Sequence, residues 1–264
     1  MYSSEWVIQA IIRLISAIIV IAVVKKSLSV YLIRGKKSIS MKYLIISFIA
    51  NAIANGVACI IAIINVFTDN PMDFLARLML ITINICNLIA ADYSVHFVAR
   101  AFYAKHSPFI LSLYDVAVAI LIGMTLIDGL RMASFSLKEN IDAIVLIIQA
   151  ILIMLISITV MKYSFTSAKA QNDILLKRSM QMYGIGITIF MISMVIIVTI
   201  TAVILPMNLP PTSPVEILLN SMTYMVTPID VYFMYVSCFH PKWFVNRYQS
   251  WWVSNEINRR MSSS

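Results

Sequence analysis

Residues 185–205 read IGITIFMISMVIIVTITAVIL, a continuous apolar run without a charged side chain. A helix of about 20 such residues crosses the roughly 30 Å hydrocarbon core of a bilayer. A strand of a transmembrane barrel would instead alternate apolar and polar residues over about ten positions. Because only helices and closed barrels satisfy their backbone groups in lipid, the run predicts a membrane-spanning helix.

The composition of the whole chain agrees with this local signal. Its 264 residues are 61% hydrophobic and 12% charged, with a mean hydropathy of +0.89, whereas soluble domains are about 25% charged. The three cysteines all lie in apolar runs, so neither a loop disulfide nor a metal-ligand spacing is present. Phosphate loops, HExxH and GxSxG are absent. We therefore expect a membrane protein that is not an enzyme and has no catalytic residue, cofactor or metal.

Six further apolar runs are separated by charged residues and prolines. The seven predicted spans are Trp6–Val24, Tyr43–Phe67, Phe74–Ala99, Phe109–Leu130, Ile141–Met161, Met182–Leu205 and Ile217–Phe239. The prediction is an all-α membrane protein, with a seven-transmembrane helix bundle in residues 1–240. Residues 241–264 carry aromatic residues at helical spacing among basic ones, which predicts a short amphipathic interfacial helix and a cytoplasmic tail.

The basic residues indicate the orientation. Sixteen of the 20 Lys and Arg fall in the four segments that follow spans one, three, five and seven. They are Lys25, Lys26, Arg34, Lys36, Lys37, Lys42, Arg100, Lys105, Lys162, Lys169, Lys177, Arg178, Lys242, Arg247, Arg259 and Arg260. Cytoplasmic loops retain positive charge, so we expect the N-terminus outside, in a multi-pass protein of the plasma membrane. The net charge of +8 then orients the chain in the bilayer and does not indicate a nucleic-acid partner.

Polar residues inside spans are the candidate functional groups, because a charge at mid-membrane costs about 2.5–3.5 kcal/mol unless it faces the bundle interior. Span three is the richest in them, with Asn84, Asn87, Asp92, His96 and Arg100. The last three are spaced i, i+4, i+8 and share one stripe toward the cytoplasmic end. The stripe is either a switch or proton path, or a local ladder whose members neutralise one another.

Spans two, one and four contain further polar residues. Asn51 and Asn55 share one face among small residues, where they either pack helices together or bind an ion or water. Arg13 and Asp115 are closer to span ends, so we expect them to reach the lipid headgroups.

In span seven, Asp230 follows two residues after the intramembrane Pro228, which frees a backbone carbonyl. An ionisable group beside such a proline favours a functional site. The same span, residues 217–239, contains no lysine, so a retinal Schiff base of the rhodopsin kind cannot form there.

Three stretches resemble the rhodopsin-like G-protein-coupled receptor superfamily. ARAFYAKHSP at 99–108 is similar to the family's (D/E)R(Y) motif with its following proline, and TPIDVY at 227–232 is similar to NPxxY. YLIISFIANAIANG at 43–56 resembles the span-two pattern, with Asn51 or Asn55 near the usual aspartate. The chain is most like the divergent chemosensory serpentine receptors of nematodes.

The resemblance implies a receptor that binds a small molecule in the outer half of the bundle and signals to a cytoplasmic heterotrimeric G protein. Asn84, Asn87, Met222 and Tyr224 would line the ligand site. The switch and coupling residues would be Asp92, His96, Arg100, Asn51, Asn55, Pro228, Asp230 and Tyr232. The chain departs from the family at Ala99, where an acid is usual, and at Tyr232, which comes one residue late.

A second function class remains open beside the receptor. Asp92, His96 and Asp230 could form the relay of a proton- or cation-coupled transporter or channel. No inverted repeat accompanies them, which weighs against a transporter.

Overall fold

The structure is a computed structural model that describes residues 4–35, 39–67, 73–102, 108–131, 138–204 and 214–248. Its long α-helices are α1 (Ser4–Val30), α2 (Ile39–Phe67), α3 (Asp73–Phe102), α4 (Pro108–Arg131), α5 (Lys138–Ala170), α6 (Ile174–Ile204) and α7 (Pro214–Phe239). A π-helical segment, η1 (Tyr31–Gly35), continues α1, and residues 242–248 form a short helix after α7. These ranges contain no strand, which confirms the all-α prediction.

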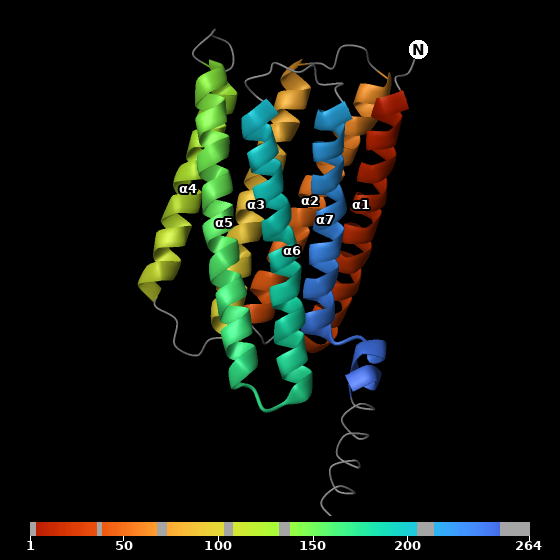
Figure 1. Cartoon of the computed structure of the whole chain (residues 1–264), viewed down its shortest axis with the longest axis vertical. Helices are drawn as coiled ribbons and strands as arrows, with labels where there is room; N and C mark the ends of the chain where they lie inside the picture. The colour runs from red at the N-terminus through yellow and green to blue at the C-terminus, as the bar shows by residue number, and fades with distance from the viewer. Residues whose placement is uncertain are drawn as a thin grey trace, which may run out of the picture.

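The long helices stand side by side (Figure 1), and their contacts close a ring. Helix α1 contacts α2 and α7, α6 contacts α5 and α7, and α3 contacts α2, α4 and α5. The short helix leaves the end of α7 at an angle to it, at the end of the bundle where the turn 171–173 joins α5 to α6 (Figure 1). We call this end the basal end.

The outer surface of the bundle is apolar. Four helices contain runs that are long and apolar enough to cross a membrane, namely Val7–Ile33, Ile39–Ile64, Ile81–Ala101 and Ile151–Ala170. Isoleucines point outward, as Ile18 and Ile120 do, while serines such as Ser16 and Ser47 are buried between helices. Apolar surface outside and small polar groups inside is the pattern that lipid favours, so the chain is a membrane protein.

Small residues bring α2 and α3 close together. Ala50, Ala54 and Ala58 recur at every fourth position of α2 and are buried against Cys86 and Ala90 of α3. Side chains that end at Cβ let two backbones approach, which strengthens van der Waals packing where lipid gives no hydrophobic drive. The small-residue pattern in residues 50–56 thus forms a helix-packing face.

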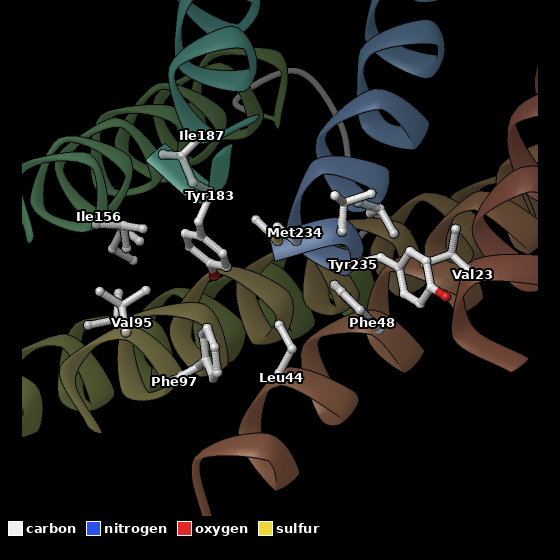
Figure 2. Packing of buried hydrophobic residues seen from close by; sticks show 14 of the residues in the cluster. Val23, Leu44, Phe48, Val95, Phe97, Ile156, Tyr183, Ile187, Met234 and Tyr235 are labelled. Atoms are coloured by element: carbon white, nitrogen blue, oxygen red, sulfur yellow. The ribbon is translucent and has the colours of Figure 1, made fainter. Parts of the chain in front are cut away.

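A layer of large side chains fills the basal half of the bundle (Figure 2). We call it the aromatic plug; it comprises Leu44, Phe48, Phe97, Tyr183, Met234 and Tyr235. Tyr183 of α6 is fully buried, and its ring centroid lies 5.5 Å from that of Phe97 on α3. Figure 2 shows the Tyr183 side chain extending from α6 toward α3. The plug therefore joins α6 to α2, α3 and α7.

Candidate functional site

A cavity of about 140 Å³ lies in the middle of the bundle between α2, α3, α5, α6 and α7. Its polar lining residues are Asn51, Asn87, Ser94, Ser157, Thr227 and Asp230. This volume can hold several water molecules but is smaller than the roughly 300–1,000 Å³ pockets that bind drug-sized ligands. The cavity suits water or a very small polar group.

The plug lies on the basal side of this cavity. On α3 and α6 the plug residue is about one turn closer to the basal end than a cavity residue, as Tyr183 is to Ile187 and Phe97 is to Ser94, and Met234 of the plug lines the cavity itself. The polar cavity is thus separated from the basal end by buried aromatic side chains.

Asp230 is the most unusual group in the cavity. Its side chain is 6% exposed, and among the described residues its Oδ1 has no hydrogen-bond partner. The facing residue on α6 is Gly186, where an added Cβ would lie 3.1 Å from that oxygen and 2.8 Å from Cβ of Phe233. The missing side chain at position 186 therefore makes room for the carboxylate and lets α6 and α7 approach.

The two asparagines of α2 have different environments. Asn55 accepts a hydrogen bond from Ser16 of α1 at 2.9 Å, and its amide donates to the Asn51 carbonyl oxygen at 2.9 Å. Asn51 donates to the Ser47 carbonyl oxygen at 3.2 Å and lines the cavity. Asn55 is thus a link between α1 and α2, and Asn51 is a cavity residue.

The stripe on α3 contacts neighbouring helices and does not form a ladder of its own. His96 Nε2 lies 2.6 Å from Asp115 Oδ1 on α4, and the imidazole stacks on Tyr43 of α2 with centroids 5.2 Å apart. Asp92, His96 and Asp115 each offer a ligand atom within 4.8 Å of the others. Asp92 and His96 are absent from the cavity lining, which contains Asp230. The predicted relay residues therefore occupy two separate places.

Arg100 and Tyr232 do not face each other. Arg100 is exposed in the last turn of α3, and its guanidinium carbon lies 5.0 Å above the Tyr43 ring centre. Tyr232 is 42% exposed and lines a shallow apolar groove between α1 and α7, together with Pro228. Two other tyrosines, Tyr183 and Tyr235 of the plug, are buried in the basal half where Tyr232 was expected.

Arg13 and Asp115 differ from the expectation that they reach the headgroups. Arg13 is only 9% exposed and donates to the Ala58 carbonyl oxygen of α2 at 3.1 Å. Asp115 keeps 48% exposure of its side chain but pairs with His96. Their partners lie 45 and 19 residues away in sequence, so no local pattern could predict these contacts.

The predicted ligand residues are only partly described. Asn87 lines the cavity, whereas Asn84, about one turn away on α3, is half-buried outside its lining. Met222 and Tyr224 lie in α7, but their side chains are outside the described residues. The proposed ligand site in that half of the bundle stays a prediction.

His240, just before the short basal helix, contacts α6. His240 has a φ of 44° and its Nε2 lies 2.6 Å from Ser179 Oγ. Its ring stacks on Phe244, which is 1% exposed, while Trp243 remains half exposed. Burial lowers the pKa of the His240 imidazole from its ordinary 6.5. Residues 242–248 are helical as predicted, and Trp251 and Trp252 lie outside the described residues.

The site residues that the sequence did not single out are Gly186 and Tyr183, and Asp115 was assigned to the headgroups. The only local signal for the first is the GIG triplet at 184–186, which interrupts a run of large residues. Comparisons of the chain with protein-family models, curated proteins and solved structures gave no match. The cavity, the plug and the α3–α4 cluster are therefore the features that bear on function.

Proposed function

We propose that this chain is a seven-transmembrane receptor of the plasma membrane, with its N-terminus outside. A small molecule binds in the outer half of the bundle, and the basal end signals to a cytoplasmic heterotrimeric G protein. The observation that carries this proposal is the polar cavity closed toward the basal end by the aromatic plug. A closed plug fits a protein that transmits a conformational change and does not conduct a solute.

The plug provides the two-state element that such a receptor needs. Tyr183 attaches α6 to Phe97 of α3 at the basal half, so separating these rings would open the basal end. A ligand shifts this equilibrium only by the difference between its affinities for the closed and open forms. Binding near Asn87, Met222 and Tyr224 would act on α3 and α7, both of which contribute to the plug.

The distribution of charge supports the orientation. Basic residues occur at the basal ends of several helices, including Lys42 of α2, Arg100 of α3, Lys169 of α5 and Arg178 of α6. All four are exposed. Positive charge near helix ends marks the cytoplasmic side, and exposed cations there can contact a soluble partner.

A transporter or channel that uses Asp92, His96 and Asp230 is the second candidate. The unpartnered oxygen of Asp230 favours it, because buried carboxylates in membranes often bind protons or cations. Against it, Asp230 belongs to the central cavity, whereas Asp92 and His96 pack toward α4 and α2. A relay through all three would have to cross the packed interior of α3.

Nucleotide exchange tests the receptor proposal. The chain in lipid nanodiscs is mixed with a panel of purified heterotrimeric G proteins, and GTP-for-GDP exchange is measured without added ligand. Tyr183→Ala removes the ring that closes the plug, so we expect basal exchange to rise. Adding Arg100→Ala to Tyr183→Ala should return basal exchange to background. Adding Lys42→Ala instead, which removes another exposed basal cation, should leave basal exchange raised.

The same variants separate the two functions. If every variant gave the same rate of nucleotide exchange as the wild type while the protein stayed monodisperse, the receptor proposal would be contradicted. Proton uptake into proteoliposomes that is lost in Asp230→Asn and kept in Arg100→Ala would instead identify a transporter.

A further inference from the structure

Two carboxylates and an imidazole meet where α3 packs against α4. Asp92 and His96 are one turn apart on α3, and Asp115 approaches from α4. One ligand atom of each residue lies within 4.8 Å of the other two. Tyr43 of α2 stacks on the imidazole, and the Tyr93 ring lies 5.6 Å from the Tyr43 ring between centroids. The cluster is therefore held by residues from three helices.

Two atoms of this cluster are buried and unsatisfied. Among the described residues, neither Asp92 Oδ1 nor His96 Nδ1 has a hydrogen-bond partner, and both are shielded from solvent. An unmade hydrogen bond at a buried polar atom is costly, so the unsatisfied oxygen of Asp92 points to a bound group. His96 would bind this group through Nε2, which lies 2.6 Å from Asp115 Oδ1, whereas Nδ1 is on the other side of the ring.

With a neutral imidazole, the charge of the cluster also favours a cation. Asp92 and Asp115 bring two like charges together at the depth of the membrane spans. The nearest arginine does not neutralise them, because the Arg100 guanidinium lies over Tyr43, and the described residues contain no ion pair between it and either carboxylate. A divalent ion would neutralise both carboxylates at once.

We propose that Asp92, His96 and Asp115 form a binding site for a divalent transition-metal ion, with Zn²⁺ as the best match. One imidazole nitrogen with two carboxylate oxygens is a ligand set that suits Zn²⁺ better than the all-oxygen ions Ca²⁺ and Mg²⁺. Three protein ligands leave a fourth tetrahedral position for water. The site is independent of the receptor proposal, since it lies outside the cavity and the plug.

Ion binding requires the three ligand atoms, now within 4.8 Å of one another, to adopt tetrahedral spacing. Tetrahedral bonds of about 2.0–2.1 Å place ligand atoms about 3.3 Å apart, so the 2.6 Å contact of His96 and Asp115 must open slightly. Asp115 can make this change because its side chain is 48% exposed, which also gives the ion a path of entry. A bound ion would strengthen the contact between α3 and α4, and the main neighbours of α4 among the long helices are α3 and α5.

The sequence alone could not indicate this site. Asp115 lies 19 residues after His96 on another helix, a spacing that matches no metal-binding motif. The expectation that the chain has no metal site rested on such motifs and on the cysteines.

Metal binding to the full chain in nanodiscs tests the proposal, with an affinity tag that contains no histidine. Equilibrium dialysis with ⁶⁵Zn²⁺ should give about one ion per chain, and bound Co²⁺ should show the visible absorption of a tetrahedral site. His96→Gln and Asp115→Asn should each weaken binding by more than about 100-fold, because removing groups that only support ligands already costs about 10- to 100-fold. His240→Gln and Asp173→Asn remove the same group types elsewhere and should leave binding unchanged.

Three outcomes would overturn the site. One is no saturable Zn²⁺ or Co²⁺ binding to the wild-type chain, which would mean that His96 and Asp115 share only a proton. Another is undiminished binding in both cluster variants. The third is a thiolate charge-transfer band in the Co²⁺ spectrum, which would place the ion on cysteine. If a cluster variant does not fold, the Co²⁺ spectrum of the wild-type chain still tests the site.

Discussion

Replacing Gly186 by alanine should weaken the contact between α6 and α7 that positions Asp230. The added Cβ would come within 2.8 Å of Cβ of Phe233 and 3.1 Å of Asp230 Oδ1. Carbon atoms in favourable contact are about 3.5–4.0 Å apart, so the first distance is too short by more than half an ångström. The Phe233 atom is attached directly to the backbone and cannot rotate away, so the helices themselves must separate.

The loss of stability in Gly186→Ala is estimated by comparison with glycines that have free space around them. An alanine Cβ at Gly56 or Gly123 would meet nothing within 4 Å. Alanine is better than glycine inside a helix by about 0.5–1 kcal/mol, so these two variants should be neutral or slightly more stable. This helix term is common to all the variants, and what distinguishes Gly186→Ala is the overpacking, which costs about 1–3 kcal/mol. Gly184 is intermediate, because its nearest atoms, from 3.0 Å outward, belong to the Phe165 ring.

Thermal unfolding of the four alanine variants in identical nanodiscs measures this order. A difference of about 2 kcal/mol corresponds to about 4–8 °C in Tm for a chain of this size. We expect Gly186→Ala to melt lowest, Gly184→Ala next, and the Gly56 and Gly123 variants at or above the wild type. A Gly186→Ala variant as stable as Gly56→Ala would refute the close approach of α6 and α7.

Other contacts give independent tests. A double-mutant cycle on Ser16→Ala and Asn55→Ala should show a coupling of about 0.6 to 1.7 kcal/mol in unfolding, and additive effects would contradict their hydrogen bond. Because burial lowers the pKa of His240 from 6.5, the unfolded segment binds more protons at acidic pH. Docking of residues 242–248 is therefore complete above pH 6.5 and weakens as pH falls. Hydrogen-exchange protection factors there, corrected for the pH dependence of chemical exchange, should fall between about pH 7.5 and 5.5, and a similar fall in His240→Gln would contradict this. Arg100→Ala should change unfolding free energy by no more than about 1 kcal/mol, because an exposed cation–π contact is weak; a larger loss would show that Arg100 is structural.

The sequence predicts the fold class because hydropathy acts along the chain. Residues such as 39–64 are long and apolar enough for a span whatever their neighbours are. Spacing along one helix also predicts which residues share a face, as the alanines of α2 do. These properties need no knowledge of how the helices are arranged.

Contacts between helices could not be predicted in this way. Helical spacing places Asp92 and His96 in one stripe but does not reveal that Asp115 lies opposite them. A shift of one residue also turns a side chain by about 100° around the helix. Tyr232 therefore faces the groove beside α1, whereas Val231, its neighbour in sequence, is fully buried in the core. A motif that is displaced by one position does not preserve the direction of its tyrosine.

The distance between the basal ends of α3 and α6 tests the central claim most directly. Spin labels are placed at Ala101 and Arg178, both exposed, after the three native cysteines are replaced by alanine. Pulsed electron paramagnetic resonance should give one short distance for the closed plug. A population longer by several ångström should appear in Tyr183→Ala with nucleotide-free G protein. An unchanged distance distribution under both conditions would contradict a plug that opens toward a G protein.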